Sequence, residues 1–147
     1  MTEEDFRRKY YFHIEFDVQW IDMDAFQHVN NKEYFRYFEK IRIDYFEERG
    51  FMAYMEENAV GPIVSSTQCR FKFPLKYPDR IIIGVYISDL GTDRFLMNYG
   101  IFSLKHQRVA AVGDAQVVCF DYSANKRAPL PEAICARLRE EMQDNAT

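Results

Sequence analysis

Apolar and polar residues alternate strictly along residues 11–21. The apolar positions are Ile14, Phe16, Val18 and Trp20, and the polar positions between them are Glu15, Asp17 and Gln19. A period of two residues predicts a β-strand with one buried face. At about 3.3 Å per residue such a strand would reach about 35 Å, well beyond the usual five or six residues. A sheet of such strands would have to cover an equally long element.

Residues 31–49 have the spacing of an amphipathic helix. Apolar side chains recur every three or four positions, and charged residues fill most of the others. The main apolar stripe consists of Tyr34, Phe38, Ile41 and Tyr45. Asn30 and Glu33 resemble a capping box at the start, and Gly50 can end the helix in a left-handed conformation. We therefore expect a helix of about 27 Å packed on the sheet, and a shorter helix over residues 51–58.

The second half of the chain has strand patterns. Strands are expected over residues 63–73, 81–88, 94–104 and 109–121, with turns at 90–93 and 105–108 and a final helix over 132–142. In the first of these strands, one face is expected to carry Ile63, Ser65, Thr67, Cys69, Phe71 and Phe73. One helix followed by consecutive hairpins predicts an α+β fold with an antiparallel sheet.

Composition narrows the class of protein. The 147 residues show no linker or repeat, so we expect a single domain over residues 1–147. The chain has no apolar run of about 18 residues and no signal-peptide stretch, which predicts a cytoplasmic protein without a membrane partner. A net charge of −4 argues against a nucleic-acid partner. Three widely spaced cysteines without a CxxC pair argue against a zinc site or a disulfide framework.

The connection between the first strand and the long helix gathers chemically useful groups. Residues 22–31 include two carboxylates, a histidine and two amides. A helix start offers free N–H groups and a positive dipole end, which can stabilise an oxyanion. A carboxylate just upstream can serve as nucleophile or general base. From these residues alone a simpler interpretation stays open, in which Asp24 or Asn30 caps the helix and His28 is a surface residue.

The segment from residue 20 to residue 42 reads W-x-D-M-D-A-F-Q-H-V-N-N-x-x-Y-x-x-Y-F-E-x-x-R. This pattern resembles the hotdog-fold acyl-CoA thioesterases of the 4-hydroxybenzoyl-CoA thioesterase family. Residues 63–65, 71–79 and 126–131 look like further parts of that family, and the resemblance covers about residues 12–142. It implies the hotdog fold, in which a curved antiparallel sheet wraps a long central helix.

The resemblance also implies roles for individual residues. Asp24 matches the catalytic carboxylate, as nucleophile or general base, and the main-chain N–H of Asn31 matches the group that binds the thioester oxygen. Asp22 is expected to be a structural hydrogen-bonding residue. Substrate contacts are expected from Phe26, His28, Val29, Tyr34 and Arg94.

Two of these substrate residues carry a further expectation. Phe26 belongs either to an acyl pocket or to the packing beneath the helix. Arg94 is the basic residue of the hairpin where relatives often place the cations that meet CoA phosphates.

Together these expectations predict a thioesterase that hydrolyses an acyl thioester of CoA or of acyl-carrier protein. No cofactor and no metal is implied. The resemblance implies a homodimer or homotetramer with its site at the dimer interface. Two alternatives stay open, namely a non-catalytic module that binds acyl thioesters, and a hotdog hydratase or dehydratase.

Overall fold

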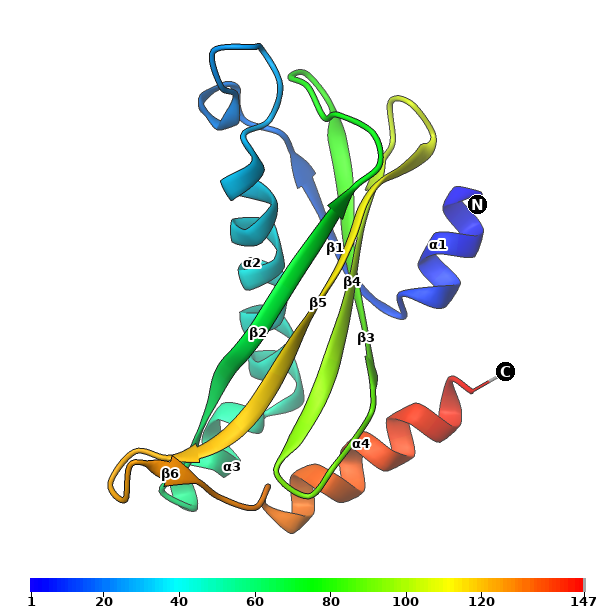
Figure 1. The fold of residues 1–147 in the computed structure, drawn as a ribbon. Helices are drawn as coiled ribbons and strands as arrows, with labels where there is room; N and C mark the ends of the chain where they lie inside the picture. The colour runs from blue at the N-terminus through cyan, green and yellow to red at the C-terminus, as the bar shows by residue number, and fades with distance from the viewer. Residues whose placement is uncertain (147) are drawn as a thin grey trace.

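One antiparallel sheet curves around a long helix in the computed structural model, which describes residues 1–146 (Figure 1). The main strands are β1 (Phe12–Asp17), β2 (Gly61–Phe71), β3 (Arg80–Ser88), β4 (Arg94–Ser103) and β5 (Arg108–Asp121). Their order in the sheet is β1-β3-β4-β5-β2, and a short β6 (Lys126–Arg127) pairs with β5. All neighbouring strands are antiparallel. The predicted α+β hotdog architecture is confirmed.

The long helix α2 (Asn31–Arg49) lies on the concave side of the sheet, and α3 (Phe51–Glu57) follows it. Gly50 separates them with a φ of 70°, a left-handed conformation that costs glycine no steric strain. The predicted boundaries of α2 are confirmed. The side chains that α2 buries in the core are Tyr34, Tyr37, Phe38, Ile41, Tyr45 and Phe46.

Gly113 of β5 allows α2 to approach the sheet closely. A Cβ atom at this position would lie 2.6 Å from Cε2 of Phe38. The Phe38 ring stacks on Tyr99 of β4, with 4.6 Å between the ring centroids. The Tyr99 hydroxyl in turn accepts a 3.0 Å hydrogen bond from Arg42 of α2. The helix is thus fixed to the middle of the sheet by packing and by a polar contact.

Strand β2 contains a β-bulge that the sequence pattern does not predict. Its ladder with β5 shifts by one position between Val64 and Ser66, which leaves Ser65 as an extra residue. An extra residue moves every position before it to the opposite face of the sheet. Ile63 therefore lies on the opposite face from Thr67, and the expectation of one common face from residue 63 to residue 73 is wrong.

Strand β1 is shorter than predicted, because it ends at Asp17. Beyond this residue β3 offers no further partner, and the N–H of Val18 donates to the carbonyl oxygen of Asp79 at 2.8 Å. The chain then forms a short 3₁₀ turn, η1 (Trp20–Asp22), whose first two residues are 71% and 82% exposed. The apolar alternation continues past the real strand end, so the predicted strand over residues 11–21 is wrong at that end.

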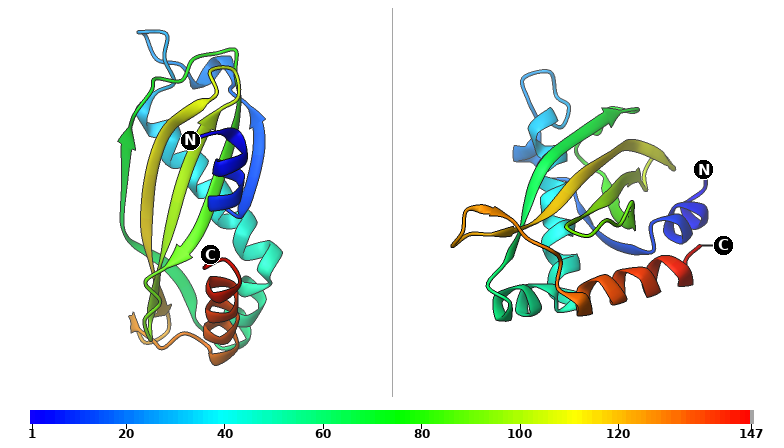
Figure 2. Two further views of the ribbon diagram at one scale, coloured as in Figure 1. Left: turned by 90° about the vertical axis from the view of Figure 1, so that its right-hand side faces the viewer. Right: turned by 60° about the horizontal axis from the view of Figure 1, so that its bottom comes forward.

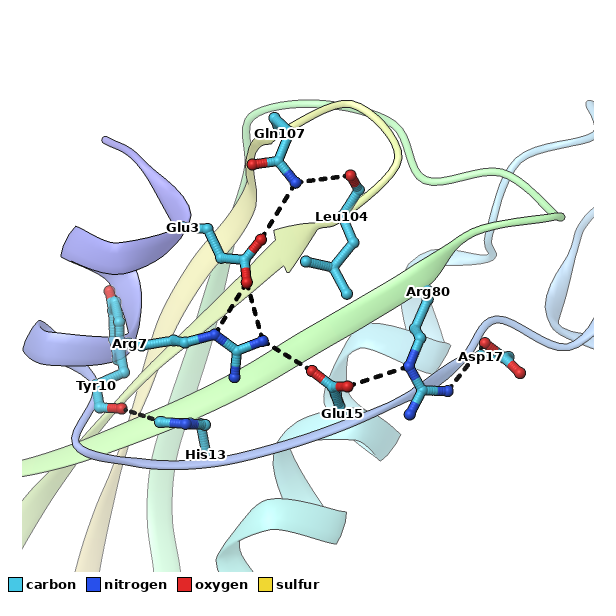
Figure 3. A network of polar contacts seen from close by, with 9 residues as sticks. All are labelled: Glu3, Arg7, Tyr10, His13, Glu15, Asp17, Arg80, Leu104 and Gln107. Carbon is cyan, nitrogen blue, oxygen red and sulfur yellow. Dashed lines mark hydrogen bonds and ion pairs between the residues drawn. The ribbon is translucent and has the colours of Figure 1, made fainter.

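Helix α1 (Glu3–Lys9), which the apolar pattern does not predict, lies against the convex face of the sheet (Figure 2). The hydroxyl of Thr2 accepts a 3.1 Å hydrogen bond from the N–H of Asp5 and caps this helix. Arg7 connects α1 to the sheet, because its guanidinium pairs with Glu15 of β1 at 2.9 Å (Figure 3). The convex face is therefore partly covered by the N-terminal segment.

Two glycines make room for α1. Gly84 of β3 and Gly100 of β4 are directly paired across the two strands. The rings of Phe6 and Tyr10 lie over them, and a Cβ on Gly100 would be only 2.6 Å from Cζ of Tyr10. Both aromatic residues are buried in a second, smaller core on this face.

The C-terminal helix α4 (Glu132–Asp144) confirms the helix predicted there. It crosses the end of the sheet where β3 turns into β4, and it buries Ile134 and Leu138 in the main core (Figure 1). Tyr45 and Arg49 of α2 both donate hydrogen bonds to Glu141. Within residues 1–146, none of the helices combines the length and the apolar composition that crossing a membrane requires.

Candidate functional site

Residues 22–30 fold into a narrow hairpin beside the start of α2. The N–H of Asp24 donates to the carbonyl oxygen of His28 at 2.8 Å, and the N–H of Asn30 donates to that of Asp22 at 2.9 Å. An antiparallel bridge between residues 23 and 29 lies between these two hydrogen bonds. The tip of the hairpin, residues 25–28, is exposed. The hairpin therefore holds Asp24 at its exposed end and connects directly to the helix.

The carboxylate of Asp24 is half-buried and held on one side only. Its Oδ1 accepts hydrogen bonds from the N–H groups of Phe26, at 2.9 Å, and His28, at 3.4 Å. Among residues 1–146 no group donates to Oδ2. One oxygen thus fixes the side chain to the loop, and the other is free to meet a substrate or a water molecule.

The first turn of α2 has a free N–H group. Asn30 caps the helix with two hydrogen bonds. Its side-chain Oδ1 accepts one from the N–H of Lys32 at 3.2 Å, and its carbonyl oxygen accepts the other from the N–H of Glu33 at 2.8 Å. The N–H of Asn31 has no acceptor among residues 1–146. It stands at the positive end of a 19-residue helix, which is where an oxyanion is best stabilised. The expected capping box does not form, because the Glu33 side chain pairs with Arg36 instead.

Asp22 ties the hairpin to α2. Its carboxylate is 4% exposed and accepts hydrogen bonds from Tyr37, Arg36 and the N–H of Gln19. Burial and the hydrogen bond to Asp22 raise the pKa of Tyr37. The structural role expected for Asp22 matches these contacts. Sequence reasoning missed Arg36 and Tyr37 as hydrogen-bond partners of Asp22, because no local pattern links them to a residue so far back in the chain.

A second anchor comes from the connection between β2 and β3. Leu75 makes two hydrogen bonds through its main chain. Its carbonyl oxygen accepts one from the N–H of Val29 at 2.9 Å, and its N–H donates one to the hydroxyl of Tyr34 at 3.2 Å. All three side chains are buried. Burial raises the pKa of Tyr34, and the N–H of Leu75 partly opposes that shift. The hairpin is therefore held from two directions, by Asp22 and by Leu75.

The five expected substrate residues occupy different environments. Phe26 is 83% exposed, so it does not fill the space beneath the helix. His28 is also exposed, beside Asp24. Val29 and Tyr34 are buried in the main core. Arg94 is the first residue of β4 and pairs with Asp93 at 3.3 Å. The turn from β3 to β4 lies at the opposite end of the sheet from the start of α2 within this chain (Figure 1).

Comparison with known proteins decides the family. Residues 18–138 match the thioesterase-like superfamily. The chain belongs to this superfamily. It is therefore a thioester hydrolase with the hotdog fold, as the resemblance implies.

Solved structures agree with this assignment. The PA2801 protein from Pseudomonas aeruginosa is 29% identical and has a TM-score of 0.76, with 86% of this chain and 96% of that chain covered. The DHNA-CoA thioesterase from Staphylococcus aureus is 21% identical with a TM-score of 0.78, covering 90% of both chains. Protein SAV2348 from the same organism, solved in complex with CoA, is 14% identical with a TM-score of 0.82, covering 90% of this thioesterase and 84% of that chain. The last two similarities establish the fold alone.

Proposed function

We propose that this thioesterase hydrolyses an acyl thioester of CoA, with the carboxylate of Asp24 and the N–H of Asn31 acting on the same thioester group. The observation that carries the proposal is a pair of unsatisfied groups at one hairpin. Oδ2 of Asp24 accepts no hydrogen bond, and the N–H of Asn31 donates none, within residues 1–146. A thioester that enters the site needs a hydrogen-bond donor for its carbonyl oxygen and a nucleophile or base near its carbonyl carbon. The N–H of Asn31 can be the donor, and the carboxylate of Asp24 can be the nucleophile or base.

Asp24 can act in either of two ways. As nucleophile, Oδ2 attacks the thioester carbonyl carbon, the C–S bond breaks, and the sulfur leaves with the electron pair as a thiolate. Water then hydrolyses the resulting anhydride to the free acid and restores the carboxylate. As general base, Oδ2 takes a proton from water while the water oxygen attacks the carbonyl, and the departing thiolate receives that proton.

The N–H of Asn31 would stabilise the negative charge that develops on the carbonyl oxygen in either route. The helix dipole adds to this effect at the first turn. Removing one such donor typically costs about 10²–10³-fold in rate. Asn30 and Asp22 keep the donor in place, because they fix the helix start and the hairpin that leads into it.

A second copy of the chain would complete the site. β2 is an edge strand of the sheet, and an unpaired edge is a template for another strand. Apolar side chains are also exposed along α2 and β2; they are Phe35, Ile43, Ile63 and Phe71. A homodimer, alone or within a tetramer, would cover them and enclose the exposed Phe26. Sedimentation of a monomer at micromolar concentration would contradict this arrangement.

Release of free thiol from a panel of acyl-CoA substrates tests the function. Asp24→Asn should lower kcat at least about 100-fold on the best substrate while the protein stays folded. Asp89→Asn is the matched control, since Asp89 is exposed and has a φ of 49° that asparagine also tolerates. Near-normal turnover of the Asp24 variant would refute its role.

The same panel separates the alternatives. Tight binding of acyl-CoA without thiol release would identify a binding module. A product formed by addition of water to an unsaturated acyl chain would identify a hydratase. Turnover of acyl-carrier protein but not of acyl-CoA would change the proposed carrier.

A further inference from the structure

A groove on the convex face concentrates positive charge in a chain whose net charge is −4. Two adjoining hollows of about 340 and 650 Å³ form it, and both are lined by Lys9, Tyr10, Lys72 and Val112. The first hollow adds Arg70 from β2, and the second adds Arg108 from β5. Four cations therefore line these two adjoining hollows, which lie between α1 and the β2–β5 edge of the sheet.

None of these four cations is neutralised by a carboxylate within residues 1–146. Lys9 lies near the ring of Tyr86, and Arg108 lies over the ring of Phe73 at 4.5 Å, but neither forms an ion pair. Among residues 1–146, Asp114 is the one carboxylate that lines the groove. Its Oδ2 accepts a 2.8 Å hydrogen bond from Gln68. The groove consequently keeps a net positive charge available to an anion.

The groove lies at the same end of the sheet as Asp24. The last residue of β2, Phe71, packs its ring against Tyr34 in the first turn of α2, with 4.9 Å between centroids. Its neighbours Arg70 and Lys72 line the groove on the other side of the sheet. Only the end of β2 thus separates the candidate catalytic hairpin from the cations. A ligand with a flexible chain can pass over this strand end and reach both.

The opposite hairpin offers less to an anion. Asp93 pairs there with Arg94 at 3.3 Å and with Arg127 at 3.8 Å. The cation expected to meet the CoA phosphates is therefore partly neutralised.

We propose that the convex groove binds the nucleotide end of CoA, with its phosphates on Arg70, Lys72 and Arg108, while the thioester lies at Asp24. The proposal rests on the function proposed above and adds the recognition surface for the carrier. Arginine and lysine are the side chains that bind phosphate groups best. Tyr86, which lines the same groove, offers an aromatic ring against which a base can stack.

Calorimetric titration of the full-length protein with adenosine 3′,5′-bisphosphate tests the groove without any requirement for catalysis. The double variant Arg70→Gln/Lys72→Gln should weaken this binding at least about tenfold. The matched control is Arg137→Gln/Arg139→Gln, which removes two exposed cations of α4 that form no ion pair within residues 1–146 and should leave binding unchanged. No saturable binding by the wild type, or equal losses in both double variants, would overturn the proposal.

Kinetics give an independent measure. The Arg70/Lys72 double variant should raise KM for acyl-CoA about tenfold or more, and leave kcat/KM for the N-acetylcysteamine thioester unchanged, since that substrate has no phosphates. An equal loss on both substrates, or a loss confined to acyl-carrier protein, would overturn the assignment. Nucleotide binding that depends on Arg70 and Lys72 in a protein without thiol release would instead refute the proposed hydrolysis and leave the groove intact.

Discussion

The hydroxyl of Tyr37 donates a 2.8 Å hydrogen bond to the buried carboxylate of Asp22, two residues before Asp24. This contact joins the candidate catalytic hairpin to the second turn of α2. Tyr37→Phe should lower the free energy of unfolding by about 1–3 kcal/mol, because it leaves a buried charged acceptor short of one donor. Urea unfolding measures the change. Tyr54→Phe, at an exposed position of α3, is the control and should have almost no effect.

Asn31→Pro removes the free N–H and changes little else. Proline is favoured at the first position of a helix, and the preceding Asn30 has a φ of −63° and a ψ of 139°, which suits a residue before proline. We expect kcat to fall about 10²–10³-fold. Asn31→Ala, which shortens the side chain but keeps the N–H, is the comparison, and the two variants should differ by that factor. Equal kcat values would assign no role to this N–H.

Gly100→Ala should displace α1 from the sheet. The new Cβ would lie 2.6 Å from Tyr10 and 2.8 Å from Phe6, and both rings are buried. We expect a loss of about 1–3 kcal/mol in the free energy of unfolding and faster proteolysis within residues 1–10. Gly91→Ala is the matched control, because its nearest neighbour would be Arg94 at an ordinary 3.4 Å. Similar losses in both variants would show that the paired glycines are not needed for close packing.

Alkaline pH should weaken the packing of Tyr10 over Gly100. Burial raises the pKa of Tyr10 from 10.0 to about 12, so the folded protein keeps this phenol neutral where the unfolded chain ionises it. The resulting stabilisation is fully present below pH 10 and is lost as the pH rises towards 12. Tyr10→Phe should therefore lose less stability than the wild type over that interval. Urea midpoints at pH 8 and pH 11 measure this difference, and an identical decline in both proteins would contradict it.

Much of the fold follows from periodicity, since α2 begins and ends where its apolar spacing and Gly50 predict. Periodicity fails where tertiary partners decide. The apolar alternation predicts that β1 continues beyond Asp17, where β3 offers no further partner. It also gives no sign of the β-bulge that leaves Ser65 as an extra residue. The sequence signal for α1 was present in Thr2 and Asp5, which form a capping box, but the helix is only seven residues long.

The candidate site likewise contains residues that the sequence predicts and residues that only the folded structure reveals. Asp24, His28 and Asn31 are close in sequence, and a motif can find them. Their supports, Tyr37 and Leu75, reach the hairpin only through the folded chain. A surface such as the groove around Arg70 is assembled from three separate segments, so no linear pattern reveals it.

The double anchoring of the hairpin has a consequence for how activity can be tuned. Because Leu75 holds both Val29 and Tyr34, small shifts in residues 72–79 would be transmitted to the carboxylate without altering any atom that meets the acyl group. Variation in that connection is a route by which sister enzymes can diverge in rate or acyl preference while their reacting groups stay the same.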